Sequence, residues 1–500
     1  MQPLHVFVFC NPTSGGNKAA KLLDLPNKKN SFAFEDKELK VNIQVRVFNL
    51  KADESRSEGF ETLKAFKPSN AVRAVAAGGD GTVKWVISEL EKVNCVDVPI
   101  GVIPFGTGND MARILGWGAT APSPLIGGDD MAALKGIIRD ICMGEPLSLD
   151  VWRVETRVDP EKGRFDVAVR GEIVERKDKA KVVIENMINY CSFGQDARAV
   201  FGFERRRRST QFLNKVQYAL EGGKLSVQPS RKLRDTELTL DESTVSSLSK
   251  NEGVIFQNIP SYAAGSDFWD ASDKWTPGDS KTPQMIGDGL LEVHGLNRVF
   301  NIALHKVTLG ALDATSRMGQ AKKIVVKFDK SSTTPLYCQV DGEPCRLTHA
   351  ESCEISPAYQ VRMISRNDAR LVLLQSVAAE TSTQPVLMSG FLLKARKHVK
   401  NDTWNSRFVA LVNREGGRLL CLEWYRGSEM RGRVVLIREG AMEAKIEKVD
   451  HGGPRPNTVF TVRTKHKSTH FAAKSEIERD TWLQSLGFSS SAVAAAETKQ

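Results

Sequence analysis

Residues 78–83 (GGDGTV) combine glycine and aspartate at the spacing of a phosphate-binding turn. An apolar run at 71–77 predicts a buried strand before the turn, and a helical pattern follows it. Backbone N–H groups at such a turn, together with the helix N-terminus, attract negative charge, and glycine lets the main chain approach a ligand. Asp80 repels phosphate unless a cation lies between them, so the turn predicts a nucleotide bound together with Mg²⁺.

Two further glycine turns lie near this one in the sequence, at 11–16 (NPTSGG) and 106–110 (GTGND). Each follows an apolar strand pattern and precedes a helical one, with the first helix expected over 17–25. Three strand–turn–helix units within the first 120 residues predict a parallel sheet with helices on its faces. Because ligands bind at the carboxyl ends of the strands in such sheets, we expect the three turns to converge.

The composition restricts the class of protein and its partners. The chain has 500 residues, 41% of them hydrophobic, and a net charge of +10, which predicts several soluble domains. The positive charge is compatible with nucleic acid, a nucleotide or an anionic membrane surface. The sequence has no nucleic-acid-binding motif, so we expect no nucleic-acid partner and favour the membrane surface over a solvated basic face. The run at 204–208 (ERRRR) leaves both interpretations open.

Targeting signals and cysteines bear on the cellular location. No apolar stretch reaches the ~18 residues of a transmembrane helix, and residues 1–10 resemble a first strand more than a signal peptide. The eight cysteines form no CxxC pair and no zinc-binding spacing, which favours reduced thiols. We therefore expect a cytoplasmic protein that is peripherally associated with membrane.

Changes in residue pattern divide the chain. We predict an ATP-binding α/β domain at 1–148 and a mainly β domain at 149–370, where helical patterns give way to short β-branched segments. A Thr- and Ser-rich linker is expected at 371–386. A small domain follows at 387–488, and residues 489–500 are expected to form a disordered tail.

Together these motifs resemble those of the eukaryotic diacylglycerol kinases, within the wider group of lipid kinases. The resemblance extends from about residue 4 to 365 and continues in the second domain at 189–197 (NYCSFGQDA), 258–263 (NIPSYA) and 339–344 (QVDGEP). It implies an α/β domain of the NAD kinase and phosphofructokinase type, with a parallel sheet, followed by a mainly β accessory domain. Lys84, Phe105 and Ala264 depart from the family pattern, Lys84 standing where glycine is common.

The resemblance implies transfer of the γ-phosphoryl group of ATP to the free hydroxyl of diacylglycerol, which gives phosphatidic acid. Asp80 would be catalytic, near Mg²⁺ or the attacking hydroxyl, and the alternative is a helix-capping aspartate at the first turn of the helix that follows. The expected ATP-binding residues are Asn11, Pro12, Thr13, Ser14, Gly15, Gly78, Gly79, Asp80, Gly81, Thr82, Thr107 and Asn109.

Two acidic residues of the second domain complete the expected site. The resemblance implies Glu343 as the base that accepts the proton of the attacking hydroxyl. From the residues alone, an acid beside Asp-Gly is more often part of a hairpin turn. Asp288 is similar to an acidic residue that helps to hold a structural Mg²⁺ in the family, although Gly-Asp-Gly is also typical of a turn.

The last hundred residues resemble a pleckstrin-homology domain, with a β-barrel closed by a helix. Lys394, Lys397 and Arg407 occupy positions that bind phosphoinositides in some members of that family. Two other functions remain open: a ceramide or sphingoid-base kinase of the same fold, and a catalytically silent lipid-binding scaffold. A silent scaffold would be expected to have lost Asp80, Glu343 or the glycines, and all are present.

Overall fold

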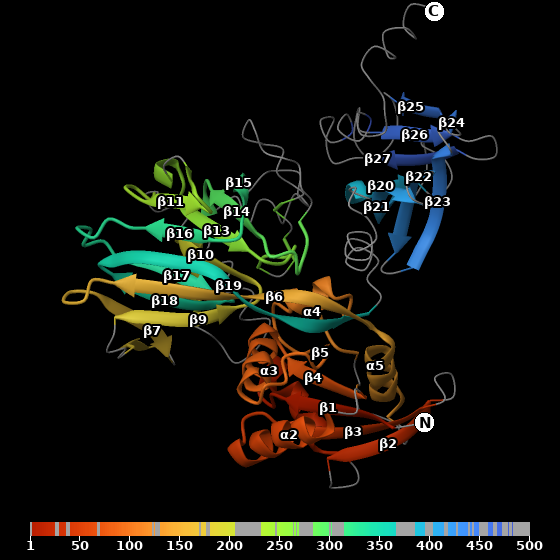
Figure 1. Cartoon of the computed structure of the whole chain (residues 1–500), viewed down its shortest axis with the longest axis horizontal. Coiled ribbons are helices and arrows are strands. Elements are labelled where there is room, and N and C mark those ends of the chain that lie inside the picture. Colours follow the sequence, from red (N-terminus) through yellow and green to blue (C-terminus); the bar gives the residue numbers. More distant parts are fainter. Residues whose placement is uncertain are drawn as a thin grey trace, which may run out of the picture. The chain divides into compact units, whose positions relative to one another are not determined.

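The computed structural model describes two compact units, the first formed by residues up to Arg366 and the second by strands beyond it (Figure 1). Side chains and backbone are described at 3–25, 30–36, 41–67, 71–122, 125, 131–169, 172–176, 181–205, 232–245, 248–263, 265–266, 268–269, 284–299, 302, 315–366, 459–463, 468–472, 479 and 483 (without the side chains of 145 and 169), and backbone alone at 386–395, 404–414, 419–426, 429–438, 441–442 and 445–449.

The N-terminal part of the first unit is built on a parallel sheet, as the sequence predicts. Its strands are β1 (Leu4–Cys10), β3 (Val41–Asn49), β4 (Val72–Gly78) and β5 (Ile100–Pro104), in the order β3-β1-β4-β5. β1 and β4 are mostly apolar and buried, with one polar residue each, His5 and Arg73, as is typical of central strands in a parallel sheet. The edge strand β2 (Ser31–Asp36) pairs antiparallel with β3.

Helices connect these strands: α2 (Asp53–Phe66), α3 (Asp80–Lys92), α4 (Asp110–Ile114) and α5 (Ala132–Met143). The buried residues of α3 recur with helical spacing, so the helix turns one apolar face to the sheet. The side chains on that face are Thr82, Val83, Val86, Ile87 and Leu90.

The helix expected over 17–25 is wrong in its form. A single turn, α1 (Ser14–Asn17), contains Gly15 and Gly16 at φ values of 64° and 66°, and a 3₁₀ helix, η1 (Lys18–Leu23), follows. The left-handed glycines interrupt a regular α-helix, because an α-helix needs negative φ at every residue. The polypeptide after β1 is therefore a glycine loop and not a helix N-terminus.

Two long antiparallel strands connect the N-terminal part to the β-rich part. β6 (Glu145–Val158) pairs along its length with β19 (Ala350–Ser365), and β19 also pairs in parallel with β5 through Met363 and Ile100. β6 runs unbroken through residue 148, so the domain boundary predicted there falls within a strand and stays a prediction.

The rest of the first unit is mostly β, as predicted. Among the residues described, the sheet that contains β1–β5 has 11 strands in all, and a second sheet has 8. The first sheet adds β9 (Val182–Met187), β11 (Glu237–Leu240), β12 (Ser243–Val245) and β16 (Ile324–Lys327). The second contains β7 (Arg164–Val169), β8 (Glu172–Glu175), β10 (Tyr190–Gly194), β13 (Gly253–Gln257), β14 (Leu291–Leu296), β15 (Thr315–Ala321), β17 (Leu336–Val340) and β18 (Glu343–Thr348).

One helix and one short 3₁₀ turn accompany these strands: α6 (Gln195–Glu204) and η3 (Leu248–Lys250). Residues 235–253 are polar and rich in Ser, yet β11, β12 and η3 lie within them. β11 pairs with β16 and buries Leu238 and Leu240, which explains why this polar stretch is ordered.

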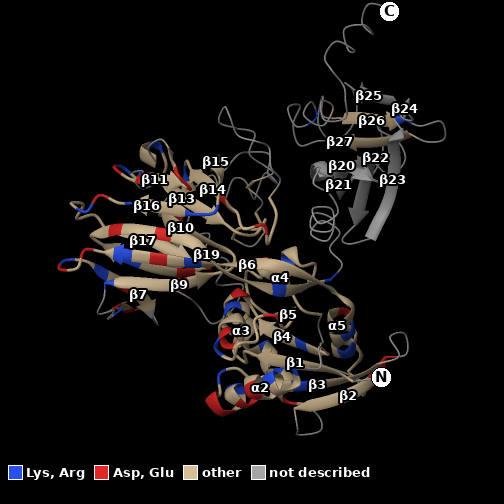
Figure 2. Ribbon diagram, viewed as in Figure 1, with Lys and Arg blue, Asp and Glu red and all other residues tan. Residues whose placement is uncertain are grey.

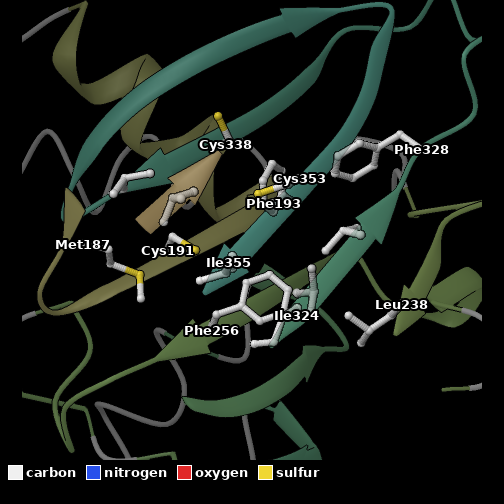
Figure 3. Close-up of a cluster of buried hydrophobic side chains, with 14 of the residues drawn as sticks. Met187, Cys191, Phe193, Leu238, Phe256, Ile324, Phe328, Cys338, Cys353 and Ile355 are labelled. Atoms are coloured by element: carbon white, nitrogen blue, oxygen red, sulfur yellow. The ribbon is translucent and has the colours of Figure 1, made fainter. Parts of the chain in front are cut away.

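An apolar core lies between the two sheets (Figure 3). The first sheet contributes side chains such as Met187, Ile324 and Ile355, and the second contributes Phe193 and Phe256. Buried residues alternate with more exposed ones along β11 and β16, whereas β13 and β14 are buried along their whole length. The two facing sheets give the β-rich part a core of its own.

The second unit is an antiparallel sheet of 8 strands among the described residues, in the order β24-β23-β22-β21-β20-β27-β26-β25. Its strands are β20 (Val386–Ala395), β21 (Trp404–Arg414), β22 (Leu419–Arg426), β23 (Glu429–Arg438), β24 (Ala441–Met442), β25 (Lys445–Val449), β26 (Val459–Arg463) and β27 (Ser468–Ala472). Helical positions follow at the buried residues Arg479 and Leu483. Most of the predicted linker and the whole predicted tail lie outside the described residues.

Charge is mixed over the described part of the first unit. Lys and Arg lie beside Asp and Glu on α2, α3 and α5 (Figure 2). Of the predicted basic run at 204–208, only Glu204 and Arg205 are described, at the end of α6, and 206–208 lie outside the described residues. No described helix is long and apolar enough to cross a bilayer.

Candidate active site

The three glycine turns converge at the carboxyl ends of β1, β4 and β5, as the sequence predicts. Asn11 Nδ2 donates a hydrogen bond to Thr82 Oγ1 (3.3 Å), which joins the first turn to the second. A Cβ on Gly79 would lie 2.9 Å from the Cα of Gly106, so the second and third turns are in backbone contact. Glycine is required there because any side chain would separate the two turns.

The cradle formed by these turns fits a phosphate group. Gly15 has a φ of 64°, and a Cβ on it would lie 2.7 Å from the carbonyl oxygen of Phe105, which places the first turn against the third. A Cβ on Gly16 or Gly81 would meet nothing within 4 Å among the described residues, so these glycines border open space. Main-chain N–H groups around such a space are suited to bind phosphate oxygens.

Asn109 supplies a buried acceptor at the same place. Its Nδ2 donates to the carbonyl oxygens of Gly106 (2.9 Å) and Ala119 (2.7 Å), which fixes the side chain. Its Oδ1 is buried and has no hydrogen-bond partner among the described residues. A buried acceptor without a donor is costly, so a nucleotide N–H or O–H group would stabilise this position. The neighbouring Thr107 is exposed.

Asp80 caps helix α4. The alternative considered from the sequence was that it caps the helix that follows it directly, which is α3. The Asp80 carboxylate accepts hydrogen bonds from the backbone N–H groups of Asp110 (3.1 Å) and Met111 (2.9 Å), at the N-terminus of α4. The helix that begins at Asp80 itself is α3, for which the N-cap is Gly79. Burial and the neighbouring Asp110 raise the pKa of Asp80 to about 6, although the backbone hydrogen bonds and one from the Asn189 side chain act in the opposite direction.

Asp110 is a second carboxylate of this site, and the sequence analysis did not assign it a role. It is only 2% exposed and accepts hydrogen bonds from Tyr190 Oη (3.1 Å), Gly265 N (2.9 Å) and Ser261 Oγ. A Cβ on Gly108 would lie 3.4 Å from Asp80 Oδ2 and 3.5 Å from Asp110 Oδ2, so both carboxylates flank that glycine.

These two carboxylates fit Mg²⁺ that is held largely by a nucleotide. Among the described residues, no group of three or more His, Cys, Asp or Glu side chains could hold a metal ion. Mg²⁺ commonly uses one or two carboxylates, with the remaining ligands supplied by substrate phosphates and water. The donor set at Asp80 and Asp110 is therefore sufficient for Mg²⁺ bound to ATP and insufficient for an all-protein site.

The predicted base Glu343 begins β18, directly after a hairpin turn. β17 and β18 pair in register through Val340 and Glu343, and Asp341 and Gly342 between them have φ values of 52° and 84°. Positive φ at both positions is the signature of a type I′ turn. The turn interpretation of this Asp-Gly pair is thus right for the backbone, and it leaves the Glu343 side chain exposed.

Asp341 is a buried anchor that the sequence analysis did not assign. Its carboxylate accepts hydrogen bonds from the backbone N–H groups of Ile188 (3.0 Å), Asn189 (2.8 Å) and Tyr190 (3.2 Å). It also forms an ion pair with Lys84 Nζ (3.5 Å) on α3. One carboxylate therefore connects the hairpin, the β9–β10 connection and the helix that begins at Asp80.

Hydrogen bonds of Tyr190 link the glycine turns to the hairpin. Its Oη donates to Asp110 (3.1 Å), which lies beside Asp80, and its backbone N–H donates to Asp341 (3.2 Å), two residues before Glu343. Loss of hydration raises the pKa of Glu343; Lys84 and Arg176 oppose this effect, and Glu185 and Asp341 add to it. Sequence spacing could not reveal this group, because its members come from segments more than 100 residues apart.

Asp288 belongs to a different acidic group. Its Oδ1 accepts the backbone N–H of Leu290 (3.0 Å), and burial, with a contribution from Asp150, raises its pKa to about 6. Glu292 is fully buried nearby, bound by Gln284 (2.8 Å) and Gln320 (2.9 Å). Among the described residues, no hydrogen bond or ion pair joins Asp288 to Asp80 or Glu343.

The basic residues predicted in the last domain are only partly described. Lys394 lies on β20 opposite Asn405, and Arg407 lies on the neighbouring β21 opposite Leu392. Lys397 lies outside the described residues. Only the backbone of Lys394 and Arg407 is described, so their predicted lipid-binding role stays a prediction.

Family comparisons support the first unit's assignment. Residues 5–145 match the family model of the diacylglycerol kinase catalytic domain, and residues 186–344 match that of the diacylglycerol kinase accessory domain. Two solved pleckstrin-homology domains, from human TBC1 domain family member 2 and human FGD3, are similar to 21% of this chain and cover 81% and 89% of their own. They share 17% identity at TM-scores of 0.16 and 0.17, too low to identify a fold.

Curated relatives agree with the family models. Human diacylglycerol kinase zeta is 31% identical over 74% of this chain and 36% of its own length. The eye-specific diacylglycerol kinase of Drosophila melanogaster is 32% identical over 68% of this chain and 21% of its own length. The chain thus spans about a third or less of these relatives. The converging glycine turns lie in the segment that matches the diacylglycerol kinase catalytic domain, the acidic hairpin lies at the end of the segment that matches the accessory domain, and the chain carries both segments.

Proposed function

We propose that the chain is an ATP-dependent lipid kinase that phosphorylates diacylglycerol to phosphatidic acid at a membrane surface. The observation that carries the proposal is the link at Tyr190, which donates its Oη to Asp110 of the third glycine turn (3.1 Å) and its backbone N–H to Asp341 of the hairpin that carries Glu343 (3.2 Å). A phosphate cradle and an exposed carboxylate base in one site are what transfer from ATP to an alcohol requires. The names of the relatives supply diacylglycerol as the alcohol.

ATP would lie over the three glycine turns. Backbone N–H groups of the turns at 11–15 and 78–82 would bind its phosphates, and Thr107 and Asn109 would close the site. Mg²⁺ bound with ATP would neutralise the phosphate charge, and Asp80 and Asp110 are the carboxylates that would face it. Burial and, after it, the neighbouring Asp110 carboxylate raise the pKa of Asp80, and a cation beside both carboxylates would stabilise their ionised form.

Glu343 would accept the proton as the lipid hydroxyl attacks. The hydroxyl oxygen forms a bond to the γ-phosphorus, the bond from the γ-phosphorus to the β–γ bridging oxygen breaks, and ADP leaves. Because Glu343 is exposed, a hydroxyl group presented from a lipid surface can reach it. A carboxylate whose pKa is raised toward neutral pH is a stronger base than an ordinary one.

The remaining assignments belong to the same proposal. The first domain would end near 148, the accessory domain near 370, and the last domain, at 387–488, would be of pleckstrin-homology type. Lys394, Lys397 and Arg407 would bind phosphoinositides and recruit a cytoplasmic enzyme to membrane. Asp288 would help to hold a structural Mg²⁺, a role that its separate acidic group supports.

A lipid panel tests the proposal. The purified full chain is mixed with labelled ATP, Mg²⁺ and neutral-detergent micelles that contain diacylglycerol, monoacylglycerol, ceramide or sphingosine. We expect labelled phosphatidic acid as the main product. Transfer to ceramide or sphingosine without transfer to diacylglycerol would overturn the substrate assignment, and binding to lipid without any transfer would favour the scaffold alternative.

A further inference from the structure

Lys84 lies between the two halves of the site, at a position that the proposed reaction has not used. It follows Asp80 by one helical turn on α3, so both side chains share a face of the helix. Its Nζ is 3.5 Å from Asp341 Oδ2, and the two side chains are 15% and 1% exposed. A lysine so little exposed needs a nearby anion, because burial of an unpaired charge is costly.

Asp341 does not need Lys84 to satisfy its hydrogen bonds. Three backbone N–H groups, from Ile188, Asn189 and Tyr190, already bind its carboxylate. Gln339 also fixes the turn, by accepting the backbone N–H of Gly342 (2.8 Å). The hairpin is therefore positioned without Lys84, and the ammonium group adds a positive charge beside a turn that is already rigid.

Four charged groups act electrostatically on Glu343, and they come from α3, β9, the residue after β8 and the hairpin turn. Lys84 of α3 and Arg176, which follows β8, are positive, while Glu185 of β9 and Asp341 of the turn are negative. Arg176 Nη1 donates to Glu185 Oε1 (2.8 Å), so these two charges partly cancel. Lys84 is the positive charge that α3 places beside the β17–β18 hairpin.

We propose that Lys84 is a positioning residue for phosphoryl transfer: its ammonium group, held by Asp341, keeps the Glu343 carboxylate ionised and ready to accept the hydroxyl proton. The inference rests on the proposed function. It also gives a reason for the ion pair between α3 and the hairpin, because the helix that begins at Asp80 then also affects the ionisation of Glu343.

The sign of the effect follows from the charges. Glu343 acts only when ionised, so activity is lost as pH falls through its pKa. Lys84 lowers that pKa, so Lys84→Met should raise it and move the acidic limb of the kcat/KM profile to higher pH. We expect a shift of about one pH unit, which gives about tenfold lower activity on the acidic limb and little change at high pH.

Three companion variants separate tuning from a general structural role. Lys84→Arg keeps the charge and should restore most of the wild-type profile. Glu185→Gln removes a negative charge and releases Arg176, so it should move the acidic limb to lower pH. Lys92→Met, on the same helix with its side chain 68% exposed and paired with Glu89, should leave the profile unchanged.

The experiment measures kcat/KM for the full chain and each variant between about pH 5 and 9, in neutral mixed micelles with diacylglycerol and Mg²⁺–ATP, alongside thermal unfolding of each protein. Opposite shifts for Lys84→Met and Glu185→Gln support the inference. An unchanged profile in a folded, active Lys84→Met protein would overturn it, as would a raised KM for ATP without any shift. Absence of lipid phosphorylation by the wild-type chain would instead refute the proposed function itself.

Discussion

At the scale of single residues, the site depends on glycines, which have no side chain, as much as on its charged residues. Gly79 and Gly106 bring two turns into backbone contact, and the space left beside Gly81 is where a phosphate fits. The types of these residues could be predicted from the sequence, because glycine at a strand-to-helix turn has few other uses. The partner of Asp80 could not, since the N-terminus of α4 is 30 residues away along the chain.

Gly79→Ala tests the contact between the turns. The added Cβ would lie 2.9 Å from the Cα of Gly106 and push the turns apart, so we expect at least a tenfold rise in the KM for ATP. The free energy of unfolding should fall by about 1–3 kcal/mol. Gly136→Ala is the control, because a Cβ there on α5 meets nothing within 4 Å, and it should stabilise the protein by about 0.5–1 kcal/mol. An unchanged KM for ATP in Gly79→Ala would contradict the convergence of the turns.

At the scale of elements, the β17–β18 hairpin presents the base and Asp341 fixes the hairpin. The Asp-Gly turn was recognisable in the sequence. The sequence did not show that its aspartate, Asp341, is buried and holds the hairpin through three backbone N–H groups. Sequence patterns also missed that β6 begins at Glu145 and continues through residue 148, because all the β-branched residues of the strand come after that point. The expected α-helix at 17–25 was wrong because Asn17 adopts positive φ and a 3₁₀ helix follows it.

Asp341→Asn tests the anchoring of the hairpin. The amide loses the ion pair with Lys84 and leaves a poorly compensated buried lysine, so we expect a loss of about 3 kcal/mol in the free energy of unfolding of the first unit. The control is Asp159→Asn, because Asp159 also accepts backbone N–H groups, from Glu161 and Lys162, but at a solvent-exposed turn. Equal destabilisation by the two variants, measured by denaturant unfolding, would argue against the anchoring role.

At the scale of the whole molecule, the sequence divided the chain into a nucleotide-binding part, a mainly β part and a small terminal domain. An α/β N-terminal part with parallel strands and a mostly β part after it are confirmed, and the family models match a segment of each, while the domain boundaries stay predictions. The type of the third stays a prediction: an antiparallel sheet occupies its place, but the residues that would identify its binding surface are described only by their backbone or not at all.

The predicted phosphoinositide site has a direct test in flotation of the full chain with liposomes. If Lys394 and Arg407 bind the headgroup, a Lys394→Ala/Arg407→Ala variant should lose about tenfold in recovery with inositide-containing vesicles and little with neutral ones. A Lys322→Ala/Lys327→Ala variant removes the same charge from exposed positions of the first unit and should bind as the wild type does. Equal recovery for both double variants would place any membrane contact elsewhere.

The central claim is that the Asp80 turn and the Glu343 hairpin form one site that transfers phosphate from ATP to diacylglycerol. The most direct measurement is the kcat for phosphatidic acid formation by Glu343→Gln, with the wild type in parallel. Because Glu343 is exposed, the variant should unfold at the wild-type temperature and bind ATP with a similar KM. We predict a fall in kcat of about 10²- to 10⁴-fold. A folded Glu343→Gln protein that keeps more than half of the wild-type kcat would contradict the account.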